Sequence, residues 1–143
     1  MATQIFVNLP VKDLNKSMEF FKNIGYSFNP QFTDDTAACL VISNEIYAML
    51  LTHEKFKEFT TKEVVDATKS TEVLIALSTE SKGDVNNMLD KVIKAGGKEF
   101  RQPMDYGFMF SRSFEDLDGH VWELLWMDPK SIHQPAEKEM ANS

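Results

Sequence analysis

The feature that most limits how this chain can fold is a repeated order of strand and helix signals. Residues 4–11 are rich in β-forming residues, and DLNKSMEFFKNIG at 13–25 places apolar residues at helical spacing before a glycine stop. Three short strand candidates follow. The second half repeats this order, with a helix predicted over 84–97 and three further strand candidates. The pattern therefore predicts two βαβββ modules in tandem.

The length of the chain sets the predicted domain organisation. Its 143 residues suffice for one hydrophobic core, so we expect a single domain over 1–128. The two modules are predicted at 4–52 and 71–127, and the connector between them at 53–70. Residues 129–143 lose the apolar periodicity and contain two prolines, which predicts a flexible C-terminal tail.

Charge and composition narrow the classes of function. The chain has 15 Lys and Arg against 22 Asp and Glu, a net charge of -7, which disfavours nucleic-acid binding. No apolar run approaches the roughly 20 residues of a membrane span, and the start MATQIF lacks a signal-peptide pattern. The single cysteine, Cys39, lies in an apolar run and fits a reducing compartment. We therefore expect a cytoplasmic protein without membrane or nucleic-acid partners.

The modules also predict where a site would form. A helix covers one face of each sheet, so the opposite, concave faces can enclose a cavity between them. Along the last strand, a period of two places Glu123 on one face and His120 on the other. The two side chains therefore point in opposite directions and do not form a metal-chelating pair.

Two segments of the chain resemble a known family. The run DLNKSMEFFKNIG after the first strand, and DLDGHVWEL near the end of the second module, are similar to the vicinal oxygen chelate superfamily of glyoxalases, bleomycin resistance proteins and extradiol dioxygenases. The resemblance spans residues 4–128 and is greatest to its glyoxalase-like subfamily. It implies an α+β fold in which two βαβββ modules pair into an incomplete eight-stranded, barrel-like sheet around a cavity. It also implies a homodimer that binds a small molecule.

The resemblance implies four inward positions that hold a divalent metal in metal-dependent members of the superfamily. These positions fall on Phe6, Met49, Glu72 and Glu123. Glu72 and Glu123 are therefore candidate ligands for Zn²⁺, Ni²⁺, Mn²⁺ or Fe²⁺. The set is incomplete, because Phe6 has no donor atom and the Met49 thioether is a soft ligand. A shift of register would place Asn8 in the position of Phe6.

Without a metal, the cavity still has candidate functional residues. Glu123 is the candidate catalytic residue, as a general base on an acidic C–H. Alternatively, Glu123 pairs with Arg112 or Arg101 and holds neighbouring strands in register. Arg112 shares a strand face with three phenylalanines and offers a cation to an anionic ligand if that face lines the cavity. The candidate substrate-binding residues are Phe6, Asn8, Met49, Tyr106 and Arg112.

Three functions are consistent with these residues. The first is a protein that binds a small polar or anionic molecule in the cavity and acts on it as a lyase or isomerase, similar to lactoylglutathione lyase. The second is a metal-free drug- or metabolite-binding dimer without catalysis. The third, an extradiol dioxygenase, has the least support, because no histidine falls at a predicted ligand position.

Overall fold

The first module forms a four-stranded sheet covered by one helix. The computed structural model describes residues 2–131, so residues 132–143 of the predicted tail lie outside the described part. The sheet has the strand order β1-β4-β3-β2, and β1 runs parallel to β4. The elements are β1 (Ile5–Val11), α1 (Leu14–Asn23), β2 (Ser27–Asn29), a 3₁₀ turn (Pro30–Phe32), β3 (Ala37–Val41) and β4 (Ile46–Thr52).

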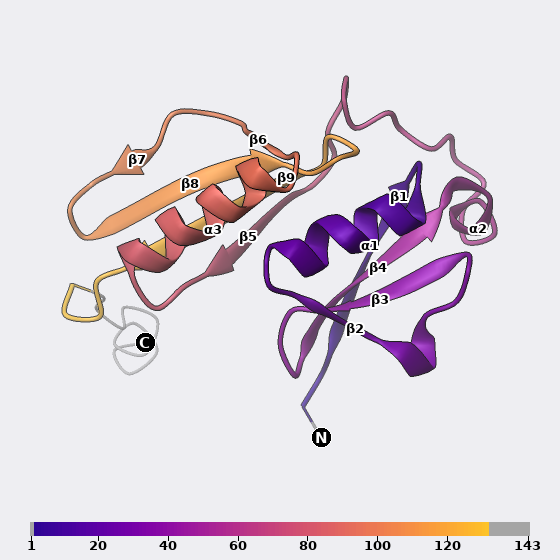
Figure 1. Ribbon diagram of the computed structural model, residues 1–143, viewed down its shortest axis with the longest axis horizontal. Coiled ribbons are helices and arrows are strands. Elements are labelled where there is room, and N and C mark those ends of the chain that lie inside the picture. Colours follow the sequence, from indigo (N-terminus) through magenta and orange to yellow (C-terminus); the bar gives the residue numbers. More distant parts are fainter. Residues whose placement is uncertain (1, 132–143) are drawn as a thin grey trace, which may run out of the picture.

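The second module repeats this arrangement after the connector. Its sheet has the order β5-β9-β8-β6, β5 runs parallel to β9, and the short β7 also pairs with β8. The fold is therefore α+β, with two open sheets, as predicted (Figure 1). The elements are α2 (His53–Phe56) in the connector, β5 (Leu74–Ser78), α3 (Lys82–Lys94), β6 (Lys98–Glu99), β7 (Met104–Asp105), β8 (Met109–Glu115) and β9 (Val121–Met127).

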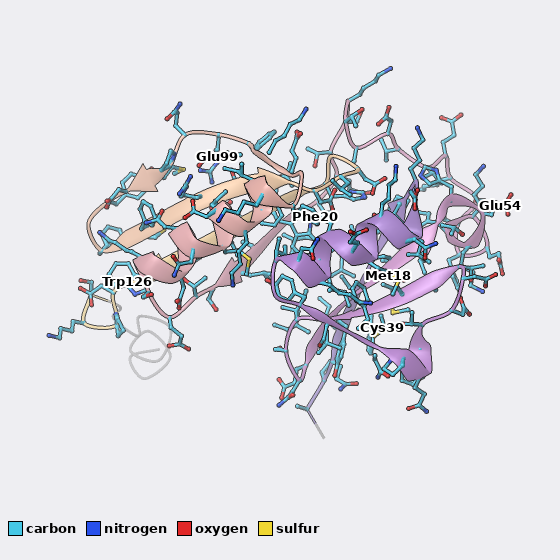
Figure 2. The ribbon with its side chains drawn as sticks, viewed as in Figure 1. Met18, Phe20, Cys39, Glu54, Glu99 and Trp126 are labelled. Carbon is cyan, nitrogen blue, oxygen red and sulfur yellow. The ribbon has the colours of Figure 1, made fainter. Side chains whose placement is uncertain are left out.

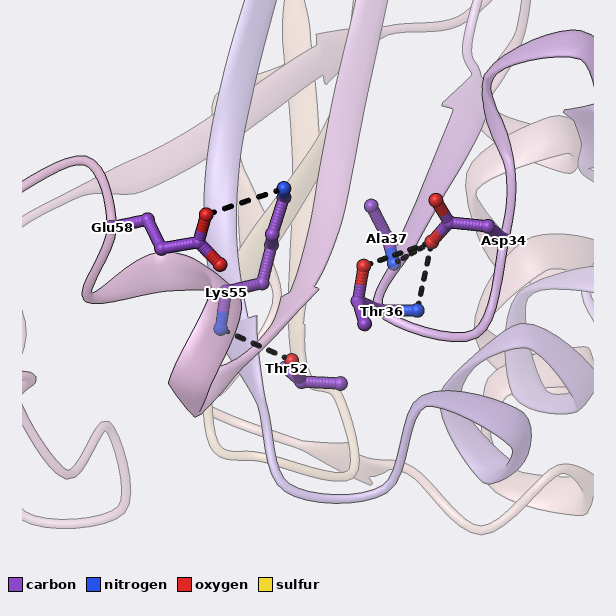
Figure 3. A network of polar contacts seen from close by, with 6 residues as sticks. All are labelled: Asp34, Thr36, Ala37, Thr52, Lys55 and Glu58. Carbon is purple, nitrogen blue, oxygen red and sulfur yellow. Dashed lines mark hydrogen bonds and ion pairs between the residues drawn. The ribbon is translucent and has the colours of Figure 1, made fainter.

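Side-chain caps fix where the helices begin. The backbone N–H of Lys16 donates to Asp13 at the start of α1, and Ser81 accepts from Asp84 in the same way at α3. Thr52 caps α2 by accepting from the N–H of Lys55, so the connector begins as a helical turn directly after β4 (Figure 3). Among the described residues, no helix is long and apolar enough to cross a membrane.

The hydrophobic core is shared between the modules. The Phe21 ring of α1 lies 5.4 Å from Trp122 of β9, and Phe20 lies 6.4 Å from Phe114 of β8, measured between ring centroids. Figure 2 shows Phe20 between the two modules. In Figure 1, α1 and α3 each lie on the near side of their sheet, and the core forms on these helix-covered faces. We call the opposite face of each sheet its open face.

The turn between β8 and β9 joins the modules by polar contacts. Asp118 Oδ1 accepts from the backbone N–H of Lys12 (2.7 Å), and its Oδ2 accepts from the Ser17 hydroxyl (3.2 Å). His120 Nε2 donates to the carbonyl oxygen of Pro10 (2.7 Å). The polar residues of the DLDGH turn therefore hold the second module against the end of β1 and the start of α1.

Candidate functional site

Glu123 lies on the open face of the second sheet. Its neighbours along β9, Trp122 and Leu124, are buried in the core beneath α3. Because side chains alternate along a strand, Glu123 points to the opposite face. The open face therefore carries an ionisable group in the middle of the sheet, between β5 and β8.

The partner of Glu123 is Arg101. The Arg101 Nη2 atom lies 3.0 Å from Glu123 Oε1, and the side chains are 33 % and 24 % exposed. Of the two arginines considered from the sequence, the structure thus pairs Glu123 with Arg101. An ion pair with this much solvent contact contributes about 1 kcal/mol or less to stability, so it does more to orient the two side chains than to hold the sheet together.

Two serines lie next to this pair on β8. Ser113 is directly opposite Glu123 in the strand register, and Ser111 is opposite Leu125, so both share the open face. Both residues are fully buried, at 1 % exposure or less. The Oγ atoms of Ser111 and Ser113, and Nη1 of Arg101, have no hydrogen-bond partner within the described residues.

Arg112 lies on the other face of the second sheet. It pairs with Leu124 in the register and points toward α3, where Nη1 donates to Asn86 (2.8 Å). Its Nε and Nη2 donate to Glu99 (2.8 and 3.0 Å), and these bonds hold the pKa of the Glu99 carboxyl below its usual value. The period of two grouped Arg112 correctly with Phe114, but that face is covered by the helix. Arg112 is therefore not beside Glu123.

Three predicted binding residues share the open face of the first sheet. Phe6 stacks on Tyr47 with 4.8 Å between ring centroids, and Asn8 is paired with Met49 between β1 and β4. Phe6 remains 46 % exposed. This face offers aromatic, thioether and amide groups without a charge, so it suits apolar or neutral contacts.

Glu72 and Tyr106 lie away from Glu123. Glu72 precedes β5, which begins at Leu74, and it lines a cavity of about 100 Å³ with Asn8 and His120. The sequence had placed Glu72 within the strand. Tyr106 lies in the turn between β7 and β8, exposed and stacked against Phe108 at 6.4 Å between centroids.

The residues at the four implied metal positions do not fit a divalent ion. No group of three or more His, Cys, Asp or Glu side chains converges within residues 2–131. Phe6 and Met49 supply no hard donor, Glu72 lies before its strand, and Glu123 is already paired with a guanidinium. The positive charge beside Glu123 is that of Arg101.

Sequence reasoning did not identify Ser111 and Ser113. Their signal was present, because two small polar residues alternate with Arg112 and Phe114 along this strand. Such an alternation predicts that the middle of one face of β8 carries only small side chains. On the open face, Arg101, Ser111, Ser113 and Glu123 form a group of polar side chains that we call the Arg101 cluster.

Comparisons with known proteins agree with this fold. The family model for the bleomycin resistance protein-like N-terminal region matches residues 3–43. No curated protein matches the chain. Hypothetical protein SA1046 from S. aureus is 29 % identical, with a TM-score of 0.74, and the match covers 88 % of this chain and 95 % of that one.

Two further solved structures share the fold at lower identity. A glyoxalase/bleomycin resistance protein/dioxygenase family enzyme from Burkholderia phytofirmans PsJN has a TM-score of 0.72 at 14 % identity, covering 88 % of this chain and 99 % of that one. The fosfomycin resistance protein FosX from Listeria monocytogenes has a TM-score of 0.64 at 19 % identity, and the match covers 96 % of this chain and 98 % of that one. These comparisons show the shared fold, and the match to the bleomycin resistance protein-like N-terminal model is confined to residues 3–43.

Proposed function

We propose that the protein binds a small polar or anionic molecule on the open face of the second sheet, at Glu123 and Arg101. The observation that supports this is the ion pair of 3.0 Å in the middle of a face that no helix within residues 2–131 covers. A paired carboxylate and guanidinium present an acceptor and donors side by side, which suits a ligand with both kinds of polar group. The expected location is the cytoplasm, in line with the single buried thiol of Cys39.

A second candidate is a lyase or isomerase reaction at the same place. It is favoured by the partial exposure of Glu123, which leaves its carboxylate within reach of a ligand proton. Catalysis would require the ion pair between Arg101 and Glu123 to loosen, so that the carboxylate can accept a proton from the ligand. Because Phe6 and Met49 offer no hard donor at two of the four implied metal positions, no step of this reaction is assigned to a metal.

Glu123→Gln tests the proposed binding. A library of small carboxylates, amides and phosphonates is screened by thermal shift with the untagged protein. A ligand present at about 100 times its Kd stabilises by about 2.7 kcal/mol, which raises Tm by roughly 5–10 °C. We expect Glu123→Gln to lose most of this rise.

Glu72→Gln is the matched control, because Glu72 lines a cavity that does not include Glu123, and this variant should keep the rise in Tm. Equal ligand responses in both variants would contradict a site at Glu123.

Elemental analysis of the same untagged protein, with and without added Zn²⁺, Ni²⁺, Mn²⁺ or anaerobic Fe²⁺, tests whether the protein binds a metal ion. One ion per chain that disappears in Glu123→Gln would restore Glu123 as a metal ligand.

We propose that the chain forms a homodimer through the exposed edges of its sheets, at β1 and β5. Ile5, Phe6 and Leu74 are 54 %, 46 % and 58 % exposed, and they lie on the edge strands β1 and β5. Large apolar side chains on sheet edges favour association with a second copy. We expect a dimer in analytical ultracentrifugation, and Leu74→Glu should shift the protein toward monomer. A monomeric wild-type protein across the accessible concentrations would exclude this interface.

A further inference from the structure

We propose that the Arg101 cluster binds an acceptor oxygen of the ligand, a carboxylate or carbonyl oxygen, through Arg101 Nη1 and the hydroxyls of Ser111 and Ser113. This inference rests on the proposed function and assigns the part of the ligand that the cluster binds. The three groups share one face of the second sheet, next to Glu123, and have no partner within the described residues.

The path of the Arg101 side chain brings these groups together. Arg101 follows β6, which pairs with the outer side of β8, and the backbone N–H of Phe100 donates to the carbonyl oxygen of Ser113. Glu123 lies on β9, on the inner side of β8. To reach Glu123, the side chain of Arg101 must therefore cross the open face of β8, where Ser111 and Ser113 lie. Small side chains at these two positions leave room for this crossing.

The type of the unpartnered atoms selects the ligand group. The Nη1 atom of arginine can only donate, whereas a serine hydroxyl can donate or accept. A donor group on the ligand could pair with the serines but not with Nη1. An acceptor oxygen can pair with all three, and buried polar groups without partners are destabilising. The cluster therefore matches an acceptor oxygen better than an amine.

Glu123 acts in this arrangement as a positioning residue for the guanidinium. Its bond to Nη2 fixes one nitrogen of the planar group, which leaves Nη1 as the free donor. Phe6 and Met49 offer no hard donor to a metal ion. The positive charge available to a ligand at Glu123 is therefore that of the Arg101 guanidinium.

The ligand needs a way to reach these buried atoms. A hollow of about 350 Å³ lies beside Arg101 and is lined by Glu99, Phe100, Arg101 and Gln102. The Arg101 side chain is itself one-third exposed toward solvent. Entry of the ligand therefore requires the Arg101 side chain to move toward this hollow, and its bond to Glu123 re-forms once the ligand oxygen is in place.

The test uses acetate as an anionic probe and acetamide as a neutral carbonyl probe. Backbone and arginine side-chain N–H resonances of the full chain are followed by heteronuclear NMR during each titration, with sodium chloride holding the ionic strength constant. We expect saturable shifts at Ser111, Ser113 and Arg101. A response to acetate alone assigns a carboxylate, and a response to both probes assigns a carbonyl oxygen.

Two arginine variants provide the matched comparison. Arg101→Met keeps the aliphatic stem and removes the donors, so acetate should bind about tenfold more weakly or not at all, as for the loss of a charge-assisted hydrogen bond. Arg112→Met removes the arginine of the other glutamate pair, on the covered face, and should leave the acetate response unchanged. Circular dichroism and thermal melting confirm that each variant folds.

The results separate the failure of this inference from failure of the proposed function. No saturable shift with either probe, or an unchanged response in Arg101→Met, would overturn the acceptor-oxygen subsite. If a library ligand still depends on Glu123 but does not shift Ser111 or Ser113, only the subsite fails. If no ligand depends on Glu123, the proposed function fails as well.

Discussion

Asp116→Ala is expected to lower the free energy of unfolding by about 3 kcal/mol, because it removes the acceptor around which the β8–β9 turn is built. The Asp116 residue is 7 % exposed. Its Oδ1 accepts from the backbone N–H groups of Asp118 and His120, both at 3.0 Å, and its Oδ2 accepts from Trp122 Nε1 at 3.1 Å. Alanine would leave these three donors without an acceptor next to the joint between the modules.

The pH dependence of this effect has a defined sign. Burial raises the pKa of Asp116 above its ordinary value, although the charge of His120 and the hydrogen bond from Trp122 act in the opposite direction. A carboxyl with a raised folded-state pKa contributes most stability when protonated, and the contribution falls as the pH rises through that pKa. The difference in stability between the wild-type protein and Asp116→Ala should therefore be larger at acidic pH than at neutral pH.

Urea unfolding followed by tryptophan fluorescence measures this prediction, and Asp105→Ala is the control. Asp105 is exposed, and its ion pair with Lys82 (3.6 Å) and the hydrogen bond that it accepts from the backbone N–H of Gly107 (2.8 Å) both lie at the surface. Its loss should therefore change stability by about 1 kcal/mol or less. A loss for Asp116→Ala no larger than that of the control would show that the turn does not depend on the buried carboxylate.

The fold was predictable because it is repeated and because periodicity is a local property. The apolar stripe of α3, with Val85, Leu89 and Val92 buried, is visible at helical spacing, and Ser81 at its start is a recognisable cap. Short strands were less certain. Of the strand candidate at 98–103, one of the three in the second module, only Lys98–Glu99 forms a strand, β6. The short β7 (Met104–Asp105) lies in the next segment, which was predicted to be a turn.

The face of a strand was not predictable from its own sequence. Alternation along β8 correctly separated Arg112 from the serines, but it did not show which set lies beneath a helix. That choice depends on where α3 packs, and α3 places Asn86 next to Arg112. The cation on the ligand face is thus Arg101, whose side chain crosses β8 to pair with Glu123. This contact depends on the relative positions of β6, β8 and β9, so the sequence of one segment alone does not predict it.

The connector contacts the second module at Gly119, whose backbone adopts a φ of +88°. A Cβ atom built at this position would lie 2.9 Å from the carbonyl group of Ala67 and from the Cα of Thr68. These are backbone atoms, which cannot rotate away as a flexible side chain would. The connector residues also line the cavity that contains Asn8, Glu72 and His120. Gly119 therefore determines how closely the connector covers this cavity.

Gly119→Ala is expected to lower the free energy of unfolding by about 3 kcal/mol, combining about 1 kcal/mol for the positive φ with about 2 kcal/mol for the close contact. Gly107→Ala separates the two terms, since Gly107 has a φ of +80° and nothing within 4 Å of the added Cβ. Urea denaturation should show a loss of about 1 kcal/mol for Gly107→Ala. Equal losses in the two variants would mean that the connector moves aside freely, because the contact with residues 67 and 68 would then add nothing to the backbone strain.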